Sequence, residues 1–197
     1  MRERQLVAVA FVALGGIVLG LTLRIDPGSA WFYPASLAVA AVWTAGAFVA
    51  GPVRPGARGP VVLPVAIGLG LAGIFVAGSL VVREIGLFAD QLRDLGDHAT
   101  EGSLPLLVVV TAVTGLAEEL FFRGSVYDAF PERAVTISTA AYVLPTLATG
   151  NLLLAFSAAV LGTVVALERW RWGGLVAPVL THLTWSLTML FALPALV

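Results

Sequence analysis

The sequence predicts an all-α fold: a polytopic transmembrane helical bundle of about seven spans plus one amphipathic surface helix. Three observations lead to this prediction. Of the 197 residues, 59% are hydrophobic and only 12% are charged, whereas a soluble domain has about 45–50% apolar and about 25% charged residues. Several apolar runs are long enough to cross a ~30 Å hydrocarbon core at ~1.5 Å per residue. One polar interval between these runs has the periodicity of an amphipathic helix.

Seven apolar segments follow one another along the chain. The fifth and sixth are short and only "TGN" divides them, so we expect one of the two to be tilted or broken. We expect residues 1–197 to form a single transmembrane domain. The segments are roughly 5–23, 31–50, 61–82, 104–127, 134–150, 151–167 and 174–196.

The ends of these segments predict the orientation of the chain. The N-terminal "MRER" and the apolar run after it are similar to a signal peptide, but the length of the run and the further spans favour an uncleaved anchor. A cytoplasmic N-terminus places eight arginines inside and three outside, which follows the positive-inside rule. Seven spans then place the C-terminus outside. The inner arginines are Arg2, Arg4, Arg54, Arg58, Arg123, Arg133, Arg169 and Arg171, and the outer ones are Arg24, Arg83 and Arg93.

The longest polar interval, 83–99, carries an apolar stripe. Ile85, Phe88, Leu92 and Leu95 recur at helical spacing, with polar side chains on the other faces. This pattern is typical of an amphipathic helix that lies at the membrane surface. The alternative is a gate over a cavity.

Composition excludes several chemistries. The chain has no cysteine, so disulfides, thiolate metal sites and a cysteine nucleophile are ruled out. The net charge of −1 gives no indication of nucleic-acid binding.

Charged residues interrupt the fourth apolar segment, in "GLAEELFFRG". On a helix, Glu119 and Arg123 are four residues apart and share a face, with the acid in the order that favours an ion pair. Glu118 is rotated by ~100° from Glu119. We therefore expect Arg123 to neutralise Glu119 and to reach the headgroups at the inner boundary, while Glu118 faces something else.

The seventh segment carries a histidine at a matching depth. Glu118 lies ~9 Å and His182 ~12 Å above the inner boundary by the helical rise, and Ser186 shares a face with His182. An ionisable residue inside a membrane indicates a functional site. The alternative is a structural network, with Glu119 and Arg123 as an internal pair and His182 as a neutral core residue.

These residues resemble a known family. "EELFFR" fits the EExxxR motif of the CAAX prenyl endopeptidase and bacteriocin-processing (CPBP, or Abi) family of intramembrane proteases, and "GGLVAPVLTHLTWS" is similar to its last, HxxxN-like motif. The resemblance covers a CPBP-like core at about 104–190. It implies a helical bundle with a polar cavity that opens toward the cytosolic side.

The resemblance also implies roles for single residues. Glu118 would be the general base, Glu119 and Arg123 its supporting pair, and His182 an oxyanion or orienting donor. Ser186 stands where the family has asparagine and can still donate a hydrogen bond.

The middle FxxxH motif departs from the family's pattern. Tyr142 takes the aromatic place and Thr146 (or Thr149 if the register slips) takes the place of the histidine. Thr146 can orient water but cannot shuttle a proton at neutral pH. Loss of an acid–base partner costs ~10²–10⁴-fold in rate. The other histidine, His98, is expected to be a solvated residue of the outer loop.

Other site chemistries find less support. A catalytic zinc site needs three protein ligands, whereas one histidine is available and Glu118 and Glu119 diverge on the helix. We therefore expect no cofactor, although the family label admits a metal. A serine-protease arrangement fails because His182 and Ser186 lie on the same helix without a third, orienting acid.

Three hypotheses remain open. The first is a CPBP-like intramembrane endopeptidase of a bacterial plasma membrane, in which Glu118 activates water to hydrolyse a peptide bond of a membrane-embedded or near-surface substrate. The second is an inactive relative that acts as a membrane scaffold or partner-binding subunit. The third is a small transporter in which Glu118 and His182 titrate as a pair.

Overall fold

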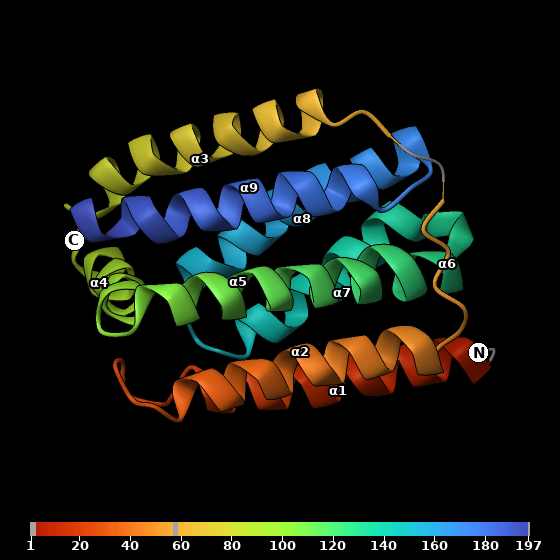
Figure 1. Cartoon of the computed structure of the whole chain (residues 1–197), viewed down its shortest axis with the longest axis horizontal. Helices are drawn as coiled ribbons and strands as arrows, with labels where there is room; N and C mark the ends of the chain where they lie inside the picture. The colour runs from red at the N-terminus through yellow and green to blue at the C-terminus, as the bar shows by residue number, and fades with distance from the viewer. Residues whose placement is uncertain (1–2, 57–58, 197) are drawn as a thin grey trace.

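A computed structural model describes residues 3–56 and 59–196, and these residues form helices and no strand (Figure 1). Arg2 and Arg58, which the orientation argument used, lie outside the described residues. The helices are α1 (Glu3–Thr22), α2 (Phe32–Val49), α3 (Val62–Val82), α4 (Gly86–Thr100), α5 (Leu104–Glu118), a π-helical segment η1 (Glu119–Val126), α6 (Tyr127–Ala129), the 3₁₀ turn η2 (Pro131–Arg133), α7 (Ala134–Leu147), α8 (Leu152–Trp172), α9 (Val176–Ala192) and the 3₁₀ turn η3 (Leu193–Ala195).

The all-helical membrane bundle is confirmed, with one change to the predicted spans. Six helical segments are long and apolar enough to cross a membrane, the fourth being the continuous run Leu104–Ala129. The expected fifth span is α7, which has 14 residues and is therefore ~21 Å long at ~1.5 Å per residue. It contains Pro145 and ends at the turn around Gly150, whose φ is +82°. Because the helix ends at this turn, α7 is too short to cross the hydrocarbon layer by itself.

The elements run back and forth between two ends of the bundle (Figure 1). α1 and α2 form one hairpin, α7 and α8 form another, and α3 packs along α9. α5 contacts both α2 and α9, and so it lies between the α1–α2 hairpin and the α3–α9 pair. The N-terminus and α6 are at one end, whereas α4 and the C-terminus are at the other.

The half of the bundle near the N-terminus is tightly filled. Trp43 of α2 stacks on Phe121 with ring centroids 5.2 Å apart, and Phe122 packs against both rings. All three side chains are buried. Gly15 of α1 gives the Trp43 ring its space, because a Cβ there would lie 2.0 Å from the indole. This aromatic cluster fixes η1, the segment that follows Glu118.

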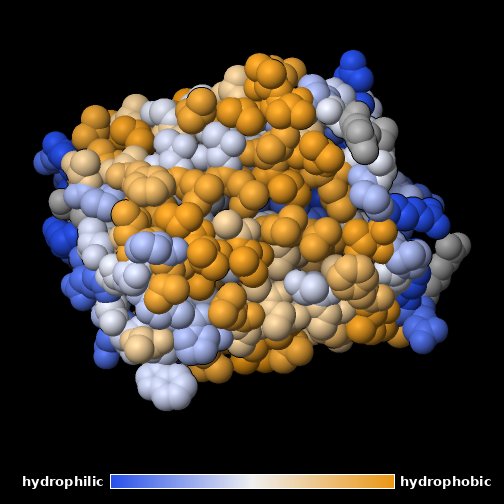
Figure 2. All heavy atoms as spheres, in the orientation of Figure 1, coloured by the Kyte–Doolittle hydropathy of each residue, from blue (hydrophilic) through white to orange (hydrophobic). Residues whose placement is uncertain are grey.

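The outside of the bundle is apolar around its middle. Figure 2 shows hydrophobic residues across the centre of one face and hydrophilic residues at its two ends. Leu6, Ile17, Ile74 and Phe156 belong to the exposed apolar side chains. An apolar belt between polar ends is what a hydrocarbon layer requires, and the chain is a multi-pass membrane protein.

The amphipathic helix α4 covers the end of the bundle opposite the N-terminus. Gln91 Oε1 accepts hydrogen bonds from Leu152 N at 2.9 Å and Leu153 N at 3.2 Å, and Asn151 Oδ1 accepts from Leu154 N at 2.9 Å. Two side chains thus satisfy N–H groups that the first turn of α8 leaves without a helical partner. α4 is therefore attached to α8 by specific hydrogen bonds.

Candidate functional site

The two glutamates lie at the junction of α5 and the π-helical segment η1. Glu118 is the last residue of α5, and η1 begins at Glu119. π-helical turns inside α-helices are rare and frequently occur at functional sites. Gly115 lets α9 approach this junction, since a Cβ there would lie 3.1 Å from Leu183 and 3.7 Å from His182 Nε2.

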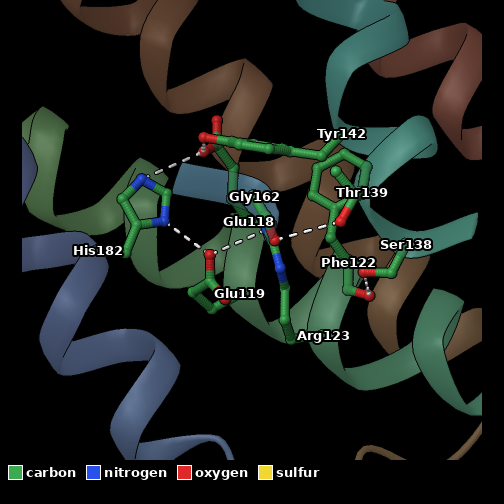
Figure 3. Close-up of polar contacts among 9 residues, drawn as sticks. All are labelled: Glu118, Glu119, Phe122, Arg123, Ser138, Thr139, Tyr142, Gly162 and His182. Atoms are coloured by element: carbon green, nitrogen blue, oxygen red, sulfur yellow. Dashed lines mark hydrogen bonds and ion pairs between the residues drawn. The ribbon is translucent and has the colours of Figure 1, made fainter. Parts of the chain in front are cut away.

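Glu119 and Arg123 form the ion pair that their spacing predicted. Arg123 Nη1 donates to Glu119 Oε1 at 3.0 Å, and Nη2 donates to the carbonyl of Gly162 on α8 at 3.1 Å (Figure 3). Both side chains have 0% exposure. The expectation that Arg123 reaches the headgroups is therefore wrong: the guanidinium is enclosed between η1, α7 and α8, where a carboxylate, a carbonyl and an aromatic ring contact it and Nε has no hydrogen-bond partner among the residues described.

His182 joins the two acids. Its Nδ1 lies 2.7 Å from Glu119 Oε1, and its Nε2 lies 3.7 Å from Glu118 Oε2 (Figure 3). The imidazole is buried. The structure thus brings α9 and the start of η1 together, at the matching depths that the helical rise gave.

Glu118 has different partners from Glu119. Tyr142 of α7 donates a hydrogen bond from its hydroxyl to Glu118 Oε2 at 3.0 Å. The Glu118 side chain keeps 14% of its surface exposed, against 0% for Glu119. Among the described residues no hydrogen bond to Glu118 Oε1 is present. Glu119 Oε2 also has no hydrogen-bond partner among them, but it is enclosed. Glu119 is therefore paired with opposite charge in the interior, while Glu118 is the acid that keeps an exposed surface.

Two of the six predicted site residues lie apart from this cluster. Thr146 is buried, and its hydroxyl donates to the carbonyl of Val143 at 2.8 Å within α7. Ser186 lies four residues beyond His182 on α9 and lines a cavity. In the described part of the chain neither hydroxyl is hydrogen-bonded to Glu118 or His182. The predicted residues that do meet are Glu118, Glu119, Arg123 and His182, and together they form the carboxylate cluster.

The cavity, of about 610 Å³, occupies the half of the bundle that α4 covers. Its wall is largely apolar. Thr114 lies on the wall one helical turn before Glu118, and Ser186 lies one turn after His182, so the wall comes within ~6 Å along each helix of the acid and the imidazole. The cavity thus adjoins the carboxylate cluster on the side away from the N-terminus.

α4 forms the outer wall of this cavity. Leu92, Leu95, His98 and Ala99 line it. The amphipathic helix predicted at 83–99 is therefore present as α4, and it also lines a cavity. The alternative, that it acts as a gate, stays a prediction. His98 is not a solvated loop residue either: it is half-buried, its Nε2 lies 3.2 Å from the carbonyl of Ile25, and its ring packs 5.2 Å from Phe32.

Two further buried polar contacts were not predicted from the sequence. Tyr142 was assigned only an aromatic role, because a motif match does not reveal where a hydroxyl points. Glu168 of α8 is buried, and its Oε1 lies 2.7 Å from the hydroxyl of Thr181, the residue before His182. The same hydroxyl lies 3.0 Å from the carbonyl of Pro64, and its one proton can be donated to only one of these two oxygens at a time. A charge near the end of a span was the only available signal for Glu168.

The donor set does not fit a resident metal ion. In the described ranges no group of three or more histidines or acids is arranged to hold one. His182 Nδ1 faces Glu119 Oε1, and the same oxygen accepts from Arg123. The three protein ligands that a catalytic zinc site usually needs are therefore not brought together among these residues.

Comparison with known proteins agrees with the motifs. Residues 100–188 match the family model described as type II CAAX prenyl endopeptidase Rce1-like. The match contains α5, η1, α7, α8 and most of α9, and therefore all the residues of the carboxylate cluster. No curated protein and no solved structure gives a match to the chain.

Proposed function

We propose that this chain, whose residues 100–188 match the family model described as type II CAAX prenyl endopeptidase Rce1-like, is an intramembrane endopeptidase in which Glu118 activates the attacking water. The observation that carries the proposal is the unequal environment of the two acids. In the part of the chain that the structure describes, Arg123 and His182 both contact Oε1 of Glu119, whose Oε2 has no hydrogen-bond partner but is fully enclosed, whereas Glu118 has an oxygen without a hydrogen bond on a side chain that is 14% exposed. A general base needs such an oxygen within reach of water.

The proposed reaction balances within the cluster. Glu118 takes a proton from water as the oxygen attacks the peptide carbonyl carbon. The C–N bond then breaks, and Glu118 returns the proton to the leaving amine. Hydrogen bonds to the developing oxyanion lower the barrier if they are already in place when the charge forms.

His182 is the candidate donor to this oxyanion. Two carboxylates and one guanidinium leave the cluster with one net negative charge, and an imidazolium brings it to zero. Buried charges are tolerated when they are paired in this way. With Nδ1 directed to Glu119, an imidazolium presents Nε2–H on the side of Glu118.

An inactive family member that serves as a membrane scaffold is the second candidate. The observation in its favour is Thr146, which stands where the middle motif has histidine and whose hydroxyl is tied to its own helix. A scaffold would keep the cavity and its α4 cover without turnover. We propose a membrane-embedded peptide or protein as substrate or partner in either case, and the bacterial plasma membrane as the location.

The Glu118→Gln variant distinguishes the endopeptidase from the scaffold. Purified protein in liposomes is incubated with two reporter peptides, one with a farnesylated C-terminus and one unmodified apolar single-span peptide. We expect wild-type cleavage of at least one reporter and a loss of ~10²-fold or more in Glu118→Gln, with no loss in Glu84→Gln, a surface acid. Cleavage should persist with a chelator.

Thr146→His tests whether the missing histidine limits the rate. We expect faster cleavage, because a histidine at this position supplies the acid–base group that threonine lacks. If neither wild type nor Thr146→His cuts a reporter, the endopeptidase proposal is rejected in favour of the scaffold.

A further inference from the structure

Tyr142 occupies a position where its ring and its hydroxyl have separate contacts. It lies on α7, one turn before Thr146, and is buried. The guanidinium carbon of Arg123 lies 4.5 Å from the centre of the ring. Phe122 packs against the ring edge-on with centroids 5.1 Å apart. The ring is therefore fixed on two sides, and the hydroxyl has little freedom to move.

The hydroxyl of Tyr142 is directed at Glu118. It donates to Oε2 at 3.0 Å, the same oxygen that His182 Nε2 approaches at 3.7 Å (Figure 3). Oε2 is thereby occupied and Oε1 is the oxygen left for water. A carboxylate with one oxygen held has a defined orientation, which is what a positioned base requires.

The donor is neutral, and this suits the charge of the cluster. Glu118, Glu119, Arg123 and an imidazolium at His182 sum to zero. A tyrosine hydroxyl adds a hydrogen bond to Glu118 without adding charge, whereas a second imidazolium would leave an excess positive charge in the interior. Buried uncompensated charge is expensive.

We propose that Tyr142 is a positioning residue for Glu118 and supplies, one turn earlier on α7, the polar contact that threonine at position 146 does not make. The inference rests on the proposed function only in treating Glu118 as the general base. That the hydroxyl holds the carboxylate is a separate statement, and it can be measured without turnover.

The test replaces the hydroxyl alone. Tyr142→Phe keeps the ring over Arg123 and against Phe122, so we expect its melting temperature to remain near the wild-type value. Tyr127→Phe is the matched control, because its ring also lies near an arginine, 5.8 Å from Arg169, outside the cluster. Glu118→Gln verifies the site of labelling.

The first readout is covalent labelling by dicyclohexylcarbodiimide, an apolar carboxyl reagent, followed by peptide mass spectrometry. We expect Glu118 to be labelled and Glu119, which is enclosed with Arg123, to stay unlabelled. In Tyr142→Phe the labelling rate of Glu118 should rise about threefold or more, because the loss of this hydrogen bond frees the carboxylate. The Tyr127→Phe rate should equal that of the wild type.

The second readout is the cleavage of the reporter peptides. A positioning role predicts a fall in kcat of ~10-fold with KM unchanged. A role in packing alone would lower the melting temperature and leave kcat per folded molecule intact. Unchanged labelling in a folded Tyr142→Phe protein overturns the inference.

The two proposals fail in different ways. If neither the wild type nor Thr146→His cuts a reporter but Tyr142→Phe still raises labelling of Glu118, the endopeptidase proposal is rejected and the contact between Tyr142 and Glu118 stands. If the wild type is active and Tyr142→Phe matches it in both readouts, the endopeptidase proposal stands and the role of Tyr142 is rejected.

Discussion

At the scale of single residues, the cluster depends on one arginine. Arg123 reaches three elements at once, with Glu119 on its own segment, the carbonyl of Gly162 on α8 and the ring of Tyr142 on α7. Gly162 leaves room for this contact, because a Cβ there would lie 3.1 Å from Arg123 Nη2 and 3.0 Å from the Tyr142 ring and would press on both. The arginine thus couples the position of both acids to the packing of α7 and α8.

Arg123→Met should destabilise the protein strongly. It removes the guanidinium partner of the buried Glu119 carboxylate, and the loss of one partner of a buried pair costs ~3–5 kcal/mol. Arg171→Met, at an exposed arginine of the same end, should change stability by less than ~0.5 kcal/mol. Denaturant unfolding in detergent measures both.

Adding Glu119→Gln to Arg123→Met should recover part of this loss, since the stranded charge is gone. Equal effects of the Arg123 and Arg171 variants would mean that the pair contributes nothing to stability.

At the scale of elements, sequence spacing predicted contacts within a helix and missed contacts between helices. The four-residue spacing of Glu119 and Arg123 gave their ion pair, and the helical rise brought Glu118 and His182 to one depth. The hydroxyl of Tyr142 on Glu118 depends on how α7 rotates against α5, and no spacing along the chain fixes that rotation. The π-helical form of η1 was missed for the same reason, since the packing of its aromatic residues is tertiary.

The attachment of α4 to α8 can be tested at one side chain. Gln91→Ala removes the acceptor for Leu152 N and Leu153 N. We expect these two amides to exchange hydrogen up to ~10-fold faster, as a lost hydrogen bond of ~0.5–1.5 kcal/mol implies. Hydrogen exchange read by mass spectrometry over residues 86–100 and 151–160 measures the effect.

Asp90→Ala is the control on the same helix, because Asp90 forms only an exposed pair with Arg93 and such pairs contribute little. If exchange at α8 rises equally in both variants, or in neither, Gln91 does not hold the two helices together.

At the scale of the whole molecule, composition and the apolar segments predicted the membrane bundle. The length of each helix could not be predicted in the same way, because it depends on contacts between helices. The segment 134–150 is mostly apolar, and for this reason it was predicted to be a span. In the structure α7 ends at Leu147, and Asn151, shortly after it, is hydrogen-bonded to α4. The same contact explains why half of an amphipathic stripe faces a cavity and not the membrane surface.

Orientation is a proposal that the chain itself makes easy to test. Because there is no cysteine, single cysteines report location without background. The arginine distribution predicts that Glu101→Cys, beside α4, reacts with an impermeant maleimide in intact cells. Glu132→Cys, at the other end, should react only after permeabilisation. Both positions are exposed.

The reverse labelling pattern would contradict the positive-inside assignment. It would also place the cavity on the cytosolic half, which is the side that the family resemblance implies for the opening. The two arguments from sequence therefore disagree about this chain, and the pair of cysteines decides between them.

The bundle is unequal along its length, with aromatic rings packed on one side of the carboxylate cluster and an apolar hollow on the other. Close packing supplies dispersion energy that a hollow forgoes. An alkyl chain that enters the hollow binds the folded state alone and raises the melting temperature by mass action. The thermal stability of the purified protein should therefore depend on the tail length of the surrounding amphiphile. Melting temperatures measured in a series of detergents would then show which alkyl chain length the hollow accommodates.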